Sequence, residues 1–105
     1  MKCLKATFAP GMASFGVIAY LKGNFKKTII RIERAIAWRG DIVEEPMYSG
    51  HLGLALLKVG EKEKAKPFLE RALKDFSNPK HLEDDENQIV ENFIKKIENA
   101  LQNIT

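Results

Sequence analysis

The feature that most constrains this chain is an internal repeat. When the sequence is compared with itself at an offset of thirty-seven residues, Gly16 falls on Gly53, and the tripeptide Glu-Arg-Ala at 33–35 recurs at 70–72. Other matches at the same offset are Gly23 with Gly60, Lys27 with Lys64, and Ile32 with Leu69. Repetition at such a period indicates stacked units of secondary structure, each of which buries its apolar face against the next.

Each copy of the repeat is predicted to form two helices. In the first copy we expect helices at about 10–22 and 25–38, and in the second at about 46–59 and 61–76, because apolar residues recur there with a period near 3.6 residues. Glycines at the matching positions 23 and 60 end the first helix of each pair. The residues that lengthen the repeat fall around 38–45, as a longer helix or a linker.

Two glycines lie inside predicted helices and need a reason to be there. Gly16 and Gly53 occupy matching positions, and a glycine inside a helix costs about 1 kcal/mol relative to alanine. Close approach of the partner helix would offset this cost. Ala35 and Ala72 occupy matching places on the partner helices, so we expect small residues to face one another at a short distance between helix axes.

A further helix is predicted at 84–103. Acidic residues at 84–86 supply an N-cap and negative charge at its start, and one apolar stripe runs along it. Two repeat lengths after Gly16 the register reaches Val90, so this helix lacks the small residue that would admit another partner. We therefore expect it to cap the open end of the second helix pair.

Composition places the whole chain, residues 1–105, in a single domain. Hydrophobic residues make up 45% and charged residues 30% of its 105 residues, which suits one modest core. Cys3 is the single cysteine, which excludes an internal disulfide and favours a reducing compartment. The longest apolar run near the N-terminus, at 17–21, is too short to cross a membrane. We therefore expect a cytoplasmic protein that does not enter the membrane.

No combination of residues predicts catalysis. His51 and His81 are the two histidines, and the motifs of metalloproteases, thiol redox proteins, serine hydrolases and phosphate-binding loops do not accompany them. The acidic residues 83–86 stand at a predicted helix start, where carboxylates act as caps far more often than as metal ligands. We expect no catalytic residues, no metal site and no cofactor, and hence no enzyme.

Charge is divided unevenly along the chain. Residues 1–40 contain eight basic residues and one acidic residue, and the remainder contains nine basic and thirteen acidic residues, so that +7 and −4 combine to the net +3. Lys27, Arg31 and Arg34 share one face of a predicted helix, here called the basic face, which ends at Trp38. Such a face can bind nucleic acid, but it is more often solvated. The division of charge favours self-association instead.

The second copy resembles a tetratricopeptide repeat (TPR), whose pattern is W-x2-L-G-x2-Y followed by A-x3-F. The segments 52–56 (L-G-x2-L) and 65–69 (A-x3-L) follow its spacing, and the first copy is a degenerate version. The tryptophan and the closing proline are absent, and the period is longer than usual. The resemblance implies an all-α array of antiparallel helix pairs, an α-α superhelix, with repeats at 9–42 and 46–79 and a capping helix at 84–103.

In TPR arrays the first helix of each pair lines a concave groove that receives a peptide or a partner helix. The resemblance implies that residues of both first helices form this surface here. They are Ala13, Val17, Tyr20, Leu21, Met47, Gly50, His51, Leu54, Leu57 and Lys58. Leu54 and Leu57 suit the core equally well. The surface is largely apolar and suits an amphipathic helix or an apolar peptide better than an acidic tail.

Family members that hold the acidic C-terminal tails of heat-shock chaperones use a clamp of Lys, Asn and Arg side chains. The matching positions here are Ala13, Val17, His51, Asp84 and Gln88, so this clamp is absent. We therefore expect a non-catalytic module that binds a peptide or helix of another protein. The alternatives are an oligomerising scaffold and, less favoured, a binder of anionic polymers through the basic face.

Overall fold

Two glycines and an asparagine set the turns within the helix pairs. Gly23 and Gly60 have φ values of 82° and 90°, in the left-handed region that glycine adopts without strain. The side-chain oxygen of Asn24 accepts a hydrogen bond from the backbone N–H of Lys27 at 3.3 Å. This bond satisfies one of the free N–H groups at the start of the following helix. The prediction that Gly23 and Gly60 end the first helix of each pair is confirmed.

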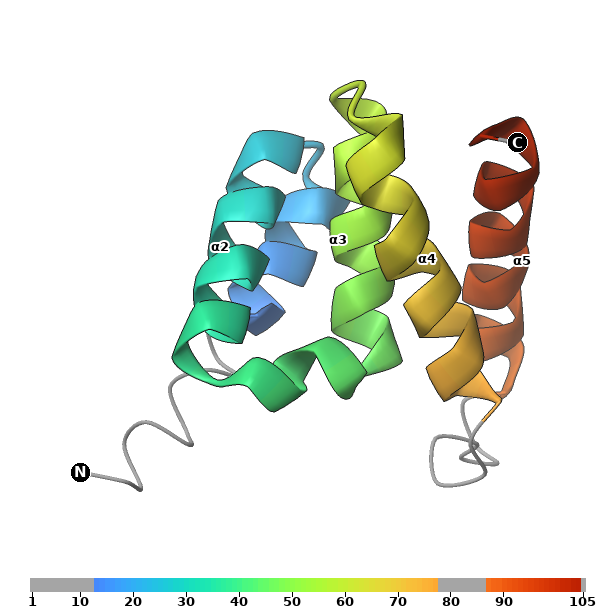
Figure 1. Cartoon of the computed structure of the whole chain (residues 1–105), viewed down its shortest axis with the longest axis horizontal. Helices are drawn as coiled ribbons and strands as arrows, with labels where there is room; N and C mark the ends of the chain where they lie inside the picture. Colours follow the sequence, from blue (N-terminus) through green and yellow to red (C-terminus); the bar gives the residue numbers. More distant parts are fainter. Residues whose placement is uncertain (1–12, 78–86, 105) are drawn as a thin grey trace.

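The computed structural model describes residues 13–77 and 87–104, which are helical apart from short connections (Figure 1). Residues 13–21 are helical and are called here the 13–21 helix. It is followed by α2 (Phe25–Trp38), the 3-10 helix η1 (Gly40–Glu44), α3 (Pro46–Lys58), α4 (Lys62–Phe76) and α5 (Asn87–Ile104). These residues contain no strand, so the all-α prediction is confirmed.

Most of the predicted helices lie where the periodicity places them. The bounds of α2 agree with the prediction, and α3 begins at Pro46, whose missing N–H is not needed in a first turn. The predicted linker forms η1, whose buried Ile42 packs with Ala13 and Ala35. The helix starts predicted at 10 and 84, the acidic residues 83–86, Cys3 and His81 lie outside the described residues.

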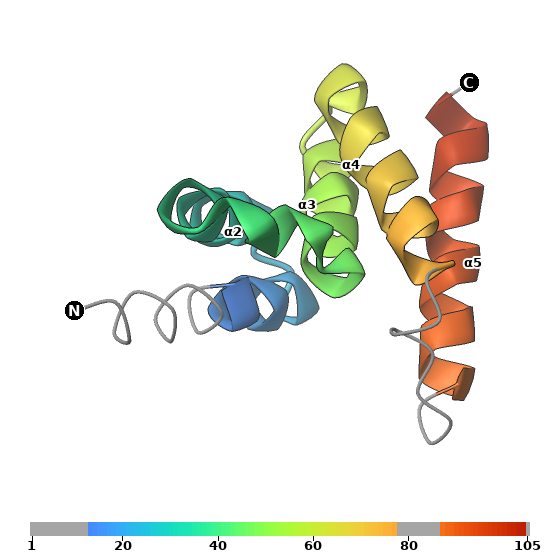
Figure 2. The same ribbon diagram turned by 60° about the horizontal axis from the view of Figure 1, so that its bottom comes forward.

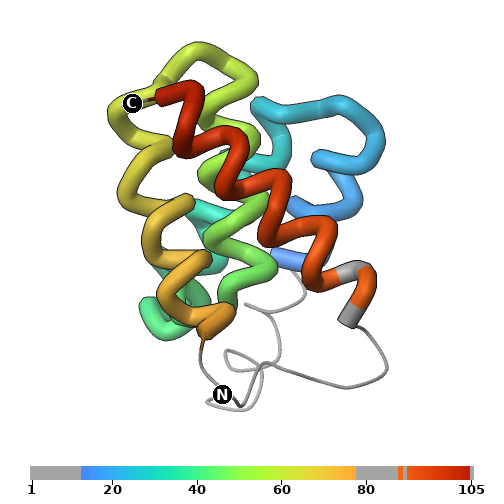
Figure 3. The backbone as a smooth tube through the Cα atoms, turned by 90° about the vertical axis from the view of Figure 1, so that its right-hand side faces the viewer, coloured from blue at the N-terminus to red at the C-terminus, as the bar shows by residue number. Residues whose placement is uncertain are grey.

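The helices pack in chain order. α2 contacts α3, α3 contacts α4, and η1 contacts all three of them. Figure 2 shows the 13–21 helix beside α2 and α3 beside α4, so that the chain forms two hairpins. α5 contacts α3 and α4 and runs obliquely across both (Figure 3). It therefore covers one side of the second hairpin.

The glycines inside the helices permit close contact within each hairpin. A Cβ atom at Gly16 would lie 2.6 Å from Cγ1 of Ile32, and one at Gly53 would lie 2.7 Å from Cγ of Leu69. Carbon atoms in favourable contact are about 3.5–4.0 Å apart. Both glycines therefore leave room for a large side chain of the partner helix, and the two contacts are thirty-seven residues apart, like the repeat itself.

The prediction that Ala35 and Ala72 face these glycines is wrong. Both alanines are fully buried, but the side chains nearest to the glycines belong to Ile32 and Leu69, which precede the alanines by one helical turn. The contact is therefore a branched side chain seated over a glycine and not two small residues facing each other.

A continuous core joins α2, α3, α4 and α5. Its largest fully buried apolar side chains are Ile32, Leu52, Leu56, Leu69 and Ile97. Burying a side chain of this size contributes about 1.5–3 kcal/mol. This core holds α3 and α5 in place relative to one another, and Tyr20 joins the 13–21 helix to it.

Candidate functional site

A hollow of about 360 Å³ opens where three helices meet, and it is called here the groove. The 13–21 helix supplies one wall, α5 supplies the other, and α3 lies between them. The lining residues are Val17, Tyr20, Leu21, Met47, His51, Asn92, Phe93 and Lys96. Figure 3 shows α5 in front, α3 behind it and the 13–21 helix to the right. The groove therefore combines residues from both repeats with residues of the final helix.

Lining residues on each helix are separated by one helical turn. The pairs at i and i+4 are Val17/Leu21, Met47/His51 and Asn92/Lys96. Residues at this spacing lie on the same face of a helix. One turn corresponds to about 5.4 Å along the helix axis, so the groove has room for a few side chains of a partner.

Aromatic rings form the base of the groove. The His51 ring stacks on Phe93 with a centroid distance of 4.4 Å, and it meets the Tyr20 ring edge-on at 5.0 Å. Tyr20 also meets Phe25 edge-on at 5.2 Å, and Phe93 meets Phe76 at 5.8 Å. Aromatic pairs at such distances contribute about 0.5–1.5 kcal/mol beyond the area that they bury. The rings therefore link the 13–21 helix and α5 through α3.

His51 is neutral at physiological pH because of where it lies. Burial lowers the pKa of its ring below the ordinary value of 6.5, the hydrogen bond to Met47 opposes this effect, and the charge of Lys96 adds to it. Nδ1 lies 2.6 Å from the carbonyl oxygen of Met47. A carbonyl oxygen only accepts, so Nδ1 carries the proton and Nε2 is the acceptor of the neutral ring.

Lys96 is the charged residue of the groove lining. Its ammonium nitrogen lies 5.3 Å from the centroid of the Tyr20 ring, in the position of a cation–π contact. The side chain is exposed, and Asn92 lies one turn before it on α5. One edge of a largely apolar groove is therefore cationic.

The structure brings together half of the residues that the TPR resemblance implies for the groove. Those that line it are Val17, Tyr20, Leu21, Met47 and His51. Tyr20 and His51 are buried, and Leu21 is 75% exposed. Exposed and buried residues therefore play different parts, since Leu21 offers a contact surface while the two rings form the base.

The prediction that Ala13 and Leu54 line the groove is wrong. Ala13 is 0% and Leu54 is 4% exposed, so neither offers a surface to a partner. Ala13 packs with Ala35 and Ile42, whereas Leu54 belongs to the main core. The reason is rotational: they lie on faces of their helices that turn toward the neighbouring helices.

Gly50, Leu57 and Lys58 also lie away from the groove lining. Gly50 is covered by α5, because a Cβ there would lie 2.7 Å from Cε2 of Phe93. Leu57 is half-buried against the core, and the Lys58 ammonium lies 5.9 Å from the Phe25 ring centroid. These three residues contribute to packing and not to the groove surface.

Three groove residues were absent from the prediction: Asn92, Phe93 and Lys96, all from α5. The resemblance assigns this helix a covering role, and its apolar stripe includes Phe93. The signal that points to the second wall is the pair Asn92 and Lys96, which are polar residues at i and i+4 beside that stripe.

The basic face lies on α2. Lys27 and Arg34 are exposed and Arg31 is half-buried, and no ion pair involves these three within the described ranges. Arg31 packs its Cβ 3.3 Å from the position that a Cβ at Gly16 would take. The three cations are not part of the groove lining.

Within the described residues, the positions compared with the chaperone-tail clamp hold no cluster of Lys, Asn and Arg side chains. Ala13 is buried, and Gln88 donates its side-chain N–H to Asn92 at 3.1 Å. Asp84 lies outside the described residues. Among the residues described, no three His, Cys, Asp or Glu side chains gather closely enough to hold a metal ion.

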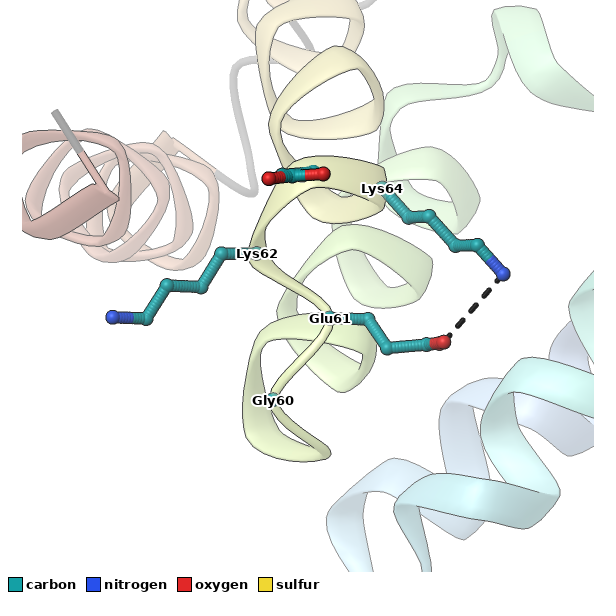
Figure 4. A pocket seen from close by; sticks show the side chains of 5 residues that line it. Gly60, Glu61, Lys62 and Lys64 are labelled. Atoms are coloured by element: carbon teal, nitrogen blue, oxygen red, sulfur yellow. Dashed lines mark ion pairs between the residues drawn. The ribbon is translucent and has the colours of Figure 1, made fainter.

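A second hollow, of about 340 Å³, lies at the turn between α3 and α4 (Figure 4). Residues 60–64 line it, and an ion pair of 3.5 Å joins Lys64 to Glu61. Figure 4 shows the Lys62 side chain pointing away from this pair. The lining has no large apolar side chain that a partner could bury, so the groove is the stronger candidate site.

None of the helices in the described part of the chain is both long enough and apolar enough to span a membrane. A scan against protein-family models and searches of curated proteins and of solved structures found no match to this chain.

Proposed function

We propose that this chain is a non-catalytic binding module whose groove receives a peptide or an amphipathic helix of another protein. The observation that supports this most is the convergence of apolar side chains from three helices on one hollow. A helix laid in such a groove gains its free energy of association mainly by burying apolar surface.

We propose, further, that the two hairpins are TPR-like repeats at 9–42 and 46–79, with a capping helix at 84–103. The contact of Gly16 with Ile32 and that of Gly53 with Leu69 support this, because both contacts recur at the period of the sequence repeat. A cytoplasmic location is part of the same proposal.

The groove is preformed on this proposal. His51, Tyr20 and Phe93 hold one another through ring contacts, and the Nδ1–H of His51 is fixed by the carbonyl of Met47. A surface that is ordered before binding loses little conformational entropy when the partner arrives. Leu21, at 75% exposure, is the apolar side chain that a partner would cover.

The test compares two variants that change exposed apolar residues. Leu21→Asp places a charge in the groove, whereas Ile30→Asp places the same charge on α2, where Ile30 is 48% exposed and outside the groove lining. Peptides would first be selected from a phage-displayed library against the wild-type chain. Their Kd for each protein would then be measured by isothermal titration calorimetry.

Leu21→Asp should weaken binding by about tenfold or more, because covering a leucine contributes about 1.5–3 kcal/mol. Ile30→Asp should leave the Kd within about twofold. Peptides that bind both variants equally well would refute the proposal, as would a failure to select any peptide. A mass well above 11.9 kDa in light scattering of the free chain would favour the scaffold alternative.

A further inference from the structure

We propose that the partner of the groove is an amphipathic helix with an acidic side chain one turn away from its apolar anchor, and that Lys96 binds this carboxylate. The inference rests on the proposed function, and it adds the chemistry that selects one partner over another. It follows from the charges around the groove and from the spacing of the residues that line it.

Among the described residues, the groove lining carries positive charge and no negative charge. Neither the 13–21 helix nor α3 contains an aspartate or a glutamate. On α5, Glu91 and Glu98 lie about 140° and 160° around the helix axis from Lys96, because successive residues are about 100° apart. Both carboxylates therefore lie on the other side of α5, and they do not neutralise Lys96.

The ammonium group of Lys96 lies where a partner would cover it. Lys96 makes no ion pair within the described residues, and its nitrogen lies over the Tyr20 ring at 5.3 Å. The ring holds the ammonium at the edge of an apolar surface. A partner that covered this surface with apolar groups alone would remove water from the charge without compensation, which is unfavourable.

The number of cations in the groove lining indicates the class of ligand that it suits. A single cation is too few for nucleic acid, because affinity for a phosphate backbone depends on several contacts. The groove instead places one cation opposite the apolar side chains of Val17 and Leu21. A helix with a leucine-like anchor and an Asp or Glu at i+3 or i+4 meets both features, since such residues share one face.

The neighbouring polar groups favour the same ligand. Asn92 lies one turn from Lys96 on the same wall, and its amide can donate a hydrogen bond to the same carboxylate. Nε2 of His51 is an acceptor in the neutral ring, so it offers nothing to a carboxylate but can accept from a hydroxyl or an N–H of the partner. The carboxylate is therefore expected on the α5 side.

The experiment uses the peptides selected from the phage-displayed library and the full chain. For one selected peptide, the acidic residue nearest to the apolar anchor is replaced by its amide. Both peptides are titrated into the wild type, Lys96→Met and Lys95→Met. Methionine keeps an apolar stem of similar length without the charge, and Lys95 is an exposed lysine of α5 outside the groove lining.

Lys96→Met should raise the Kd of the acidic peptide about tenfold, while Lys95→Met should change it by less than about twofold. The amide peptide should bind the wild type and Lys96→Met equally. A third peptide carries a lysine in place of the acidic residue, and a further variant is Lys96→Glu. This lysine peptide should bind Lys96→Glu more tightly than it binds Lys96→Met. Unfolding curves of the variants, followed by circular dichroism, check that they fold.

The outcomes separate this inference from the proposed function. If Leu21→Asp abolishes binding but Lys96→Met does not weaken it, the groove is the binding site and the acidic partner is refuted. Selected peptides without acidic residues would refute it equally. If Leu21→Asp does not weaken peptide binding, the proposed function is refuted, and so is the inference that rests on it. A dimer that Leu21→Asp dissociates would show that a second copy fills the groove, which would also overturn the inference.

Discussion

The contact between Gly53 and Leu69 brings α3 and α4 close together because Gly53 has no side chain. A Cβ at Gly53 would lie 2.7 Å from both Cγ and Cδ2 of Leu69 and 3.2 Å from the carbonyl oxygen of Ala65. Contacts between carbon atoms are about 3.5–4.0 Å long, so a methyl group would have to displace Leu69 or α4 by roughly 1 Å. Replacing a helical glycine by alanine stabilises by about 1 kcal/mol, whereas overpacking costs about 1–3 kcal/mol. Gly53→Ala should therefore lower the free energy of unfolding by up to about 2 kcal/mol.

A double-mutant cycle isolates the contact that causes this loss. Leu69 is fully buried, so Leu69→Ala should lower the free energy of unfolding by about 2–5 kcal/mol. In that background most of the clash is gone, and Gly53→Ala should raise the free energy of unfolding by up to about 1 kcal/mol. Urea titrations followed by far-UV circular dichroism give all four values. If Gly53→Ala stabilises both backgrounds by the same amount, the close contact between the helices does not exist.

Two further predictions concern a helix start and the base of the groove. Glu61 and Asn24 occupy matching positions with φ of −96° and −94°, but the Glu61 side chain makes no capping hydrogen bond. Glu61→Asn should raise the free energy of unfolding by about 1 kcal/mol, reduced slightly by the loss of the exposed ion pair with Lys64. An unchanged urea midpoint would contradict this prediction. Burial lowers the pKa of His51 in the folded chain below 6.5, the ordinary value that applies to the unfolded chain. Between these two pKa values the unfolded chain binds more protons than the folded chain. The stability that is present above pH 6.5 is therefore lost as the pH falls through the folded pKa. His51→Phe should therefore show a smaller loss of stability than the wild type between about pH 8 and about pH 5, and equal losses in urea titrations would show that His51 does not titrate differently on folding.

The sequence predicts the helices well because their signals are local. The repeat aligns Gly23 with Gly60, and each of these glycines has the positive φ that ends a helix. α2 occupies the predicted range because apolar periodicity, a capping asparagine and a glycine all agree there. η1 is different, because a 3-10 helix of five residues is too short to show a period.

Only part of the groove could be predicted from the sequence, because its shape depends on how the helices rotate and pack. Membership of a first helix indicates Val17 and Leu21, but it does not distinguish them from Ala13, which faces η1 and α2. The α5 wall depends on Gly50, where the absence of a side chain lets Phe93 approach α3. No periodicity within α3 indicates which distant helix will fill that space, and the polar pair Asn92 and Lys96 marks one face of α5 without showing that this face lines the groove.

The groove residues serve two purposes, and this determines which substitutions can test function. Tyr20 is 8% exposed and contacts Phe25, His51 and Lys96, so Tyr20→Ala would remove core contacts and cost about 3–5 kcal/mol by analogy with other buried aromatic residues. Loss of binding in that variant would not separate a missing contact from a displaced α5. Leu21 and Lys96 are exposed, so their substitution changes the surface offered to a partner and leaves the core intact. A binding site built on the core must therefore be tested at its exposed edge, where folding and recognition depend on different side chains.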